Sequence, residues 1–135
     1  MIIERIRTDP DPYEPFLLSQ AIRAGDLLFV SGQAGYDDDG QIVQGGFGAQ
    51  ATQAFANLER ALRAGGASFA DVVKVTIFVT DMAANFPTVV ERRRQHFSPP
   101  YPADSIVEVA GLYTPEAQIE IEAIAVVGGE RPPSP

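Results

Sequence analysis

VVKVTIFV, residues 72–79, is the stretch of sequence that decides the fold of this chain. Its β-branched and aromatic residues are typical of a β-strand. Isoleucine and valine occupy both of the alternating positions along it, so both faces of the strand are expected to be buried. The segment therefore predicts a strand in a sheet that is covered on both sides.

Two helices are predicted, one before and one after this strand in the sequence. Residues 50–62 (QATQAFANLERAL) carry apolar residues at helical spacing and leave polar residues on the opposite side. A second helix is expected to run to about Phe97, with Asn85 as its N-cap and Pro87 in its first turn. The proline-rich residues 98–102 end this helix.

The remaining strands are predicted from alternating or β-branched segments: residues 2–7, a hairpin of residues 19–23 and 27–31, and residues 105–110 and 118–127. The order β-β-β-α-β-α-β-β predicts an α+β fold, a two-layer sandwich of a mixed sheet with two helices on one face. We expect a single domain over residues 1–127 and a flexible C-terminal tail over residues 128–135.

The second face of that sheet predicts an oligomer. Two helices on one face leave the other face open, although the apolar residues 72–79 require burial on both sides. In a chain of this size the second cover has to come from another subunit. We therefore expect a homo-oligomer that buries its open sheet faces together.

Composition excludes several classes of function. The 135 residues contain no cysteine and one histidine, His96, which argues against a thiol nucleophile, a multi-histidine metal site and a Ser–His–Asp triad. The net charge of −8 argues against a nucleic-acid partner. No apolar run reaches the ~20 residues that span a bilayer, so no membrane partner is expected. The N-terminus lacks the features of a signal peptide, and a cytoplasmic protein is the expectation.

Several segments together resemble one family. SQAI at residues 19–22, LFVSGQ at residues 28–33, VVKVTIFVTDM at residues 72–82, PADSIVEVA at residues 102–110 and IEIEAIA at residues 119–125 look like the Rid/YjgF family of imine and enamine deaminases, some of which carry the label endoribonuclease L-PSP. The likeness is collinear from about residue 19 to residue 127.

This resemblance implies a fold and a reaction. The fold would be chorismate-mutase-like, in a homotrimer with a cleft at each subunit interface. The reaction would be hydrolysis of a small reactive imine, or of its enamine tautomer, to a carbonyl compound and ammonia. The resemblance implies no metal and no organic cofactor. It also implies that the backbone of Ser31 and Gly32 lines the cleft and that Glu120 orients the attacking water.

The chain departs from the family pattern at four expected substrate-binding positions. Asp104 stands in PADS where the family motif, proline-alanine-arginine-serine, has the arginine that binds the substrate carboxylate. Leu18 stands at the place of a family tyrosine, Val90 at that of an asparagine and Ile106 at that of a cysteine.

Asp104 is expected to change the choice of substrate. Two charges about 4 Å apart interact by roughly 4 kcal/mol at an effective dielectric constant of 20, so a carboxylate in place of the arginine would repel an α-imino acid. The hypothesis is a preference for a neutral or cationic imine or enamine, unless one of Arg92, Arg93 and Arg94 supplies the missing charge. Alternatively, Asp104 is a turn residue that faces solvent.

Strand carboxylates are the candidate bases. Glu108, Glu120 and Glu122 qualify because burial in an apolar interface would raise the pKa of a carboxyl group toward neutrality. The alternative for each is an ion pair or a solvent-facing position. His96 is predicted to be structural, with the helix dipole favouring its charged form.

Two functions of different class remain. The first is an imine or enamine hydrolase that uses no cofactor, with Glu120 as the residue that orients water. The second is a catalytically silent protein that binds a small metabolite or a partner through the same cleft. Charge disfavours an endoribonuclease.

Overall fold

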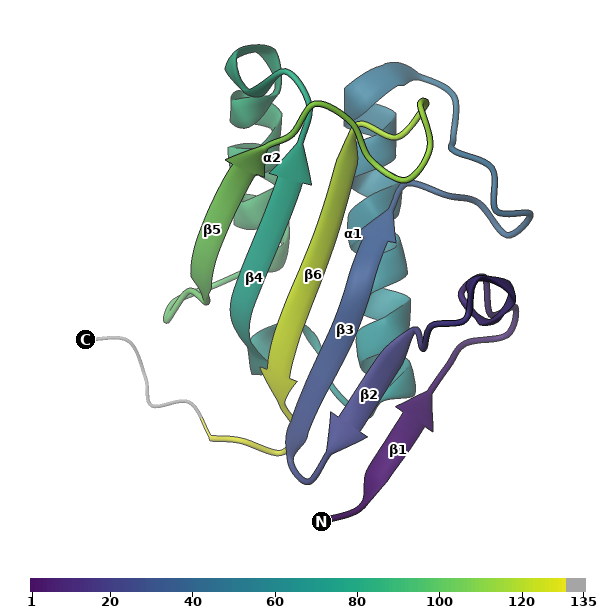
Figure 1. Ribbon diagram of the computed structural model, residues 1–135. Coiled ribbons are helices and arrows are strands. Elements are labelled where there is room, and N and C mark those ends of the chain that lie inside the picture. Colours follow the sequence, from purple (N-terminus) through teal and green to yellow (C-terminus); the bar gives the residue numbers. More distant parts are fainter. Residues whose placement is uncertain (131–135) are drawn as a thin grey trace.

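The computed structural model describes residues 1–130 and contains a six-stranded sheet with two α-helices (Figure 1). In chain order the elements are β1 (Ile3–Ile6), the 3₁₀ turn η1 (Glu14–Phe16), β2 (Ala21–Ala24), β3 (Leu27–Ala34), α1 (Gly46–Ala64), the 3₁₀ turn η2 (Phe69–Asp71), β4 (Val72–Val79), α2 (Met82–His96), β5 (Ala103–Glu108) and β6 (Ile119–Val126). The predicted order of strands and helices is confirmed. Of the predicted tail, residues 131–135 lie outside the described residues.

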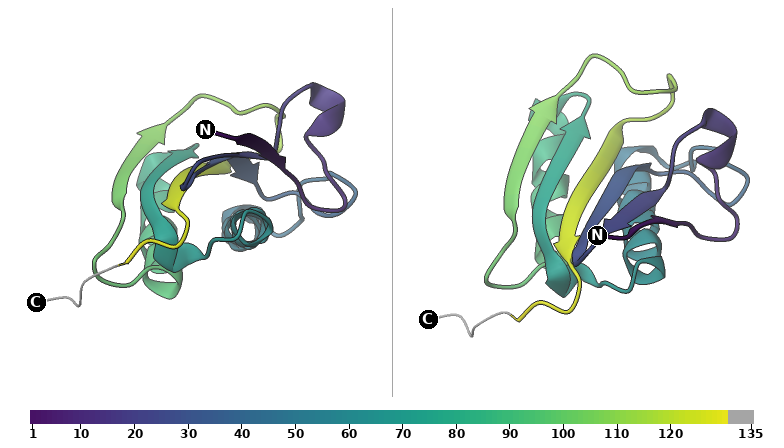
Figure 2. Two further views of the ribbon diagram at one scale, coloured as in Figure 1. Left: turned by 90° about the horizontal axis from the view of Figure 1, so that it is seen from below. Right: turned by 60° about the horizontal axis from the view of Figure 1, so that its bottom comes forward.

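The sheet is mixed and its helices lie on one side. Its strand order is β1-β2-β3-β6-β4-β5; β4 and β5 are parallel and the other pairs are antiparallel. The parallel pair is joined through α2, since parallel neighbours need a crossover connection. Seen end-on, both helices pack against the same face of the curved sheet (Figure 2). The predicted α+β two-layer sandwich is confirmed.

The core fills the space between this face and the helices. Along β4 and β6 alternate residues are fully buried, among them Val75, Ile77 and Ile121. These side chains pack against the apolar side of α1, as period-2 strands and an amphipathic helix require.

His96 belongs to this core, which corrects the expectation about its charge. Its ring stacks on Phe55, with ring centroids 4.9 Å apart, and packs against Phe69 at 4.8 Å. Burial lowers the pKa of His96 and thus favours the neutral form. The expected preference for the charged form is therefore wrong, and Arg92 nearby lowers the pKa further.

The opposite face of the sheet is open and carries apolar side chains. Leu27, Phe29 and Val107 are 40%, 42% and 41% exposed. Phe29 lies opposite Ile124 in the ladder, so the apolar surface continues from β3 onto β6. A second subunit over this face remains a prediction.

The start of α2 differs from the sequence-based expectation. The N-cap is Asp81, in the left-handed region at φ 49°, and Asn85 lies inside the helix with its side chain donating to the Thr80 carbonyl at 2.7 Å. The backbone N–H of Met82 donates to Glu108 Oε1 at 2.8 Å. A carboxylate from β5 thus caps the helix, so Glu108 has a structural partner and is removed from the candidate bases.

Candidate functional site

Glu120 lies against a kink in β3 on the open face of the sheet. The pairing of β3 with β6 shifts register between Val30 and Gln33, so Ser31 and Gly32 lie in a bulge. A Cβ added to Gly32 would lie 2.6 Å from Cδ of Glu120. Only glycine leaves room for the Glu120 side chain in this position. Bulges of this kind are frequent beside active sites, where they re-aim a side chain or the backbone.

The bulge is held from behind by hydrogen bonds. The Ser31 N–H donates to the Gln20 carbonyl at 2.9 Å, and Ser31 Oγ donates to the Ser19 carbonyl at 2.7 Å. The Tyr13 hydroxyl donates to the Gly32 carbonyl at 2.7 Å. Segments before β2 therefore fix the backbone on which Glu120 rests.

Two buried tyrosines extend this support, and no local sequence pattern indicates their pairing. The hydroxyls of Tyr13 and Tyr36 lie 3.1 Å apart, and Tyr36 donates to Gln33 Oε1 at 2.6 Å. Burial raises the pKa of Tyr13, and it raises the pKa of Tyr36 to about 12. Both hydroxyls keep their protons at neutral pH and serve as donors. Tyr13 thus supports the bulge through its hydrogen bond to Gly32.

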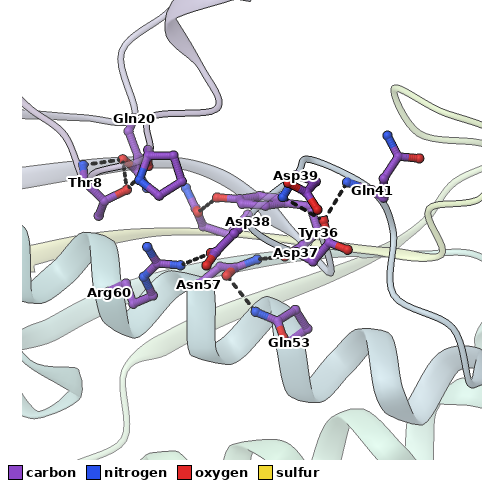
Figure 3. A network of polar contacts seen from close by, with 12 residues as sticks. Thr8, Gln20, Tyr36, Asp37, Asp38, Asp39, Gln41, Gln53, Asn57 and Arg60 are labelled. Atoms are coloured by element: carbon purple, nitrogen blue, oxygen red, sulfur yellow. Dashed lines mark hydrogen bonds and ion pairs between the residues drawn. The ribbon is translucent and has the colours of Figure 1, made fainter.

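A polar network lies under the end of β3 and the loop that follows it (Figure 3). Asn57 of α1 donates to the carbonyls of Ala34 and Tyr36, both at 2.9 Å, and Arg60 pairs with Asp38 at 3.1 Å. The cavity among these groups has a volume of about 10 Å³, room for one water at most. We assign the network to support of the loop.

Glu120 has the electrostatics of a carboxylate base. It is half-buried, and burial is the larger cause that raises its pKa, followed by the nearby charge of Glu122. Tyr113, in the loop between β5 and β6, lies close enough for Glu120 to contribute to a raised tyrosine pKa, after burial. A carboxylate with a raised pKa accepts a proton from water more readily.

Asp104 sits in a second cluster, at the edge of the sheet and under α2. Arg93 donates through Nε to Asp104 Oδ2 at 2.9 Å and through Nη2 to Oδ1 at 2.7 Å. The Asp104 side chain is 18% exposed and that of Arg93 26%. The alternative of a solvent-facing turn residue is wrong, because Asp104 lies in β5. The expected repulsion needs correction too, since an arginine pairs with this carboxylate.

A cleft of about 290 Å³ adjoins this ion pair, lined by Arg93, Phe97, Tyr101, Pro102, Asp104 and Ile106. Val90 is half-buried on α2, about one turn before Arg93. Of the neighbouring arginines, Arg92 donates to the Gly48 carbonyl at 3.1 Å and Arg94 pairs with Glu91. Only Arg93 of the three contacts Asp104.

Leu18 is 45% exposed and lies in the chain between η1 and β2.

The two clusters lie on opposite faces of the sheet. Asp104 is the ladder partner of the fully buried Val75, on the face that the helices cover. Glu120 alternates with the buried Ile119 and Ile121, so it projects from the open face. The structure therefore brings together Glu120, Ser31 and Gly32, and separately Asp104 and Ile106. It does not bring the two groups to one point within a chain.

Within residues 1–130, no group of three or more His, Cys, Asp or Glu side chains is placed to hold a metal ion. Over the same residues no helix has the length and apolar character to cross a membrane.

The chain is a small α+β protein of two layers, and its sheet carries a glutamate against a glycine bulge. Residues 7–127 match the sequence model of the family described as Endoribonuclease L-PSP, and the chain belongs to this family. The resemblance to Rid/YjgF proteins is thereby confirmed.

Named relatives and solved structures agree. The human 2-iminobutanoate/2-iminopropanoate deaminase is 40% identical over 111 residues, which are 82% of this chain and 80% of the relative. The protein of the same name from Dermatophagoides farinae is 38% identical over 119 residues, 87% of this chain and 90% of the relative. A crystal structure of a putative endoribonuclease from Thermotoga maritima superposes with a TM-score of 0.85 at 42% identity, covering 93% of this chain and 98% of the other. RidA from Psychrobacter gives 0.84 at 36% identity, covering 92% and 99%.

Proposed function

We propose that this protein hydrolyses a small reactive imine, or its enamine tautomer, to a carbonyl compound and ammonia. The observation that carries the proposal is the contact of Glu120 with the Gly32 bulge, where a half-buried carboxylate of raised pKa faces backbone on which a small ligand could rest. The names of the relatives, 2-iminobutanoate/2-iminopropanoate deaminases, support the same reaction.

The reaction needs only modest help from the protein. A water molecule adds to the carbon of the C=N bond while ionised Glu120 accepts its proton. Glu120 passes that proton to the imine nitrogen, which gives a tetrahedral adduct with one hydroxyl and one amino group. The adduct collapses as Glu120 transfers the hydroxyl proton to the nitrogen and the C–N bond breaks, so that one water and one imine give one carbonyl compound and one ammonia. Positioning of the water and of the imine supplies most of the rate. No metal or organic cofactor takes part in these steps.

The proposal includes an assembly of several copies, with a homotrimer as the specific expectation. The apolar residues on the open face support it, since exposed patches of this kind mark interfaces. Glu120 and Asp104 lie on opposite faces of the sheet, so one substrate meets both only if a second copy brings one cluster to the other. We place the working site at that interface, with Ser31 and Gly32 from one copy facing Asp104, Ile106 and Val90 of the next. Leu18 would border it.

The test is release of ammonia from a freshly generated imine by the purified protein. Glu120→Gln removes the base and keeps the shape of the side chain, and we expect turnover to fall about 100-fold or more with folding retained. Glu122→Gln is the matched control, because it removes a charge from the same face and is expected to keep turnover. Absence of turnover in the unmodified protein would favour the silent binding protein instead. Cleavage of RNA, which the net charge of −8 disfavours, is checked in parallel.

A further inference from the structure

The ion pair of Arg93 and Asp104 is a neutral unit in the wall of the cleft beside α2 and β5. Nε and Nη2 of Arg93 donate to the two carboxylate oxygens of Asp104 at 2.9 and 2.7 Å. Both side chains are less than one-third exposed. Each charge is compensated by its immediate neighbour, so the pair as a whole presents no net charge to a molecule in the cleft.

The rest of the cleft is apolar. Two aromatic rings, a pyrrolidine ring and a branched aliphatic chain complete its lining, from Phe97, Tyr101, Pro102 and Ile106. Tyr101 is 67% exposed, so part of this wall is in contact with solvent. A ligand that covers apolar surface removes it from water, and each buried methylene group strengthens binding by about fourfold. The lining therefore favours a ligand with an apolar group.

The volume of the cleft sets the size of that group. At about 290 Å³ it lies near the lower end of known ligand pockets, which range from roughly 300 to 1,000 Å³. A compound of three or four carbons would leave much of the apolar wall in contact with water. A single aromatic ring or a branched aliphatic chain would cover it.

We infer that this cleft selects its substrate by apolar bulk and not by charge, so that the substrate class is an imine or enamine without a carboxylate, bearing one ring or a branched aliphatic group. A substrate carboxylate would gain little, because the adjacent charge of Asp104 offsets the attraction of Arg93. Its loss of water beside the apolar wall would also cost free energy. A cationic imine gains as little, since Asp104 is already paired.

The inference rests on the proposed imine hydrolysis for its reaction, but the choice of ligand can be measured without turnover. The experiment measures binding of acetone, pyruvate, acetophenone and benzoylformate to the full chain by calorimetry or NMR. Pyruvate and benzoylformate replace one methyl group of acetone and of acetophenone by a carboxylate. We expect acetophenone to bind about tenfold or more tightly than acetone, and the carboxylate to bring no gain in either pair.

Two results of this comparison would overturn the inference: tighter binding of benzoylformate than of acetophenone, and equal binding of acetone and acetophenone. Tyr101→Ala removes an exposed part of the wall, and we expect it to weaken acetophenone binding by about threefold or more while acetone binding is unchanged. Ile2→Ala is the matched control, because it removes an exposed apolar side chain that does not line the cleft.

The neutrality of the ion pair has its own variants. Arg93→Gln leaves the Asp104 carboxylate unpaired in the wall and should weaken acetophenone binding and turnover by about tenfold or more. The double variant Arg93→Gln/Asp104→Asn removes both charges, keeps both shapes and should restore acetophenone binding. Loss of that binding in the folded double variant would overturn the inference.

The outcomes separate this inference from the proposed function. A preference for acetophenone without ammonia release from its imine would leave the inference standing and defeat the proposed function. Ammonia release together with tighter binding of the two carboxylates would defeat the inference and leave the proposed function standing.

Discussion

Asp104 and Glu120 project from opposite faces of one sheet, with β4 between the strands that carry them. The first is paired with an arginine beside a cleft, and the second lies on a glycine bulge. A small molecule cannot contact both within one chain. If both groups act on one substrate, the site is shared between copies.

Gly32→Ala should impair turnover while the fold survives. The added Cβ would lie 2.6 Å from Cδ of Glu120, so the carboxylate has to move off the bulge. We expect kcat/KM to drop by about tenfold or more, and the free energy of unfolding to change by less than ~1 kcal/mol because the clash is with a movable side chain. Gly111→Ala is the matched control, since a Cβ there meets nothing within 4 Å. Equal loss in both variants would contradict the assigned contact.

The pH dependence should report the ionisation of Glu120. Burial and the Glu122 carboxylate raise its pKa, so kcat/KM should fall as the pH drops through a value above 4.5. Glu122→Gln removes one of the two causes and should move this acid limb to lower pH. An acid limb that the Glu122→Gln variant leaves unmoved would speak against Glu120 as the titrating group.

Because its pKa is raised, Glu120 should lower the free energy of unfolding at neutral pH. The folded state binds the proton more tightly than the unfolded state, so stability falls as the pH rises from about 4.5 through the folded pKa. Glu120→Gln should therefore raise the melting temperature at pH 7 and not at low pH. Thermal melts of both proteins across this pH range measure the effect, and an equal shift at every pH would contradict it.

The pair of Arg93 with Asp104 should be measurable as a coupling energy. Its two hydrogen bonds of 2.9 and 2.7 Å join side chains that are less than one-third exposed. A double-mutant cycle with Arg93→Gln and Asp104→Asn should give a coupling of about 1–3 kcal/mol in unfolding free energy, above the value for an exposed pair. The same cycle on the exposed Arg63–Glu59 pair is the control. A coupling near zero would mean that Asp104 does not hold Arg93.

A charge on the open face should break the assembly. Phe29 is 42% exposed on β3 and lies opposite Ile124, so Phe29→Asp would bury a carboxylate in the proposed interface. We expect a trimer for the unmodified protein and smaller species for the variant in sedimentation experiments. Ala56→Asp places the same charge on the exposed side of α1 and should leave the assembly intact. A monomeric unmodified protein would refute the proposed assembly.

Most of the fold could be predicted because its signals are local. The β-branched run Val72–Val79 matches β4 residue for residue, and the apolar spacing of residues 50–62 lies inside α1. The predicted start of α2 was wrong, because the helix is capped by the carboxylate of Glu108 from β5, which no local pattern reveals. The predicted charge of His96 was wrong as well, because its ring packs against Phe55 and Phe69, which are far away in the sequence.

The candidate site was predictable in part. The family resemblance assigned Glu120 and Gly32 to one cleft, but only the three-dimensional structure shows their contact. The sequence alone did not decide which of Arg92, Arg93 and Arg94 lies near Asp104, because consecutive residues point to different sides of a helix. The chain order held part of the signal: α2 joins β4 to its parallel neighbour β5, which makes a contact between α2 and β5 plausible, and the structure shows that Arg93 makes it.

The most direct test of the shared site mixes two inactive variants. Glu120→Gln removes the proposed base, and Arg93→Gln removes the arginine that pairs with Asp104 at the part of the site proposed to come from the next copy. Subunits of both variants are unfolded and refolded together. If each site takes Glu120 from one copy and Arg93 from the next, every mixed trimer contains one intact site, and activity should return to about a quarter of the unmodified value. The separately refolded variants, combined afterwards without exchange, should stay inactive. Mixed trimers that form and yet release no ammonia would contradict the account.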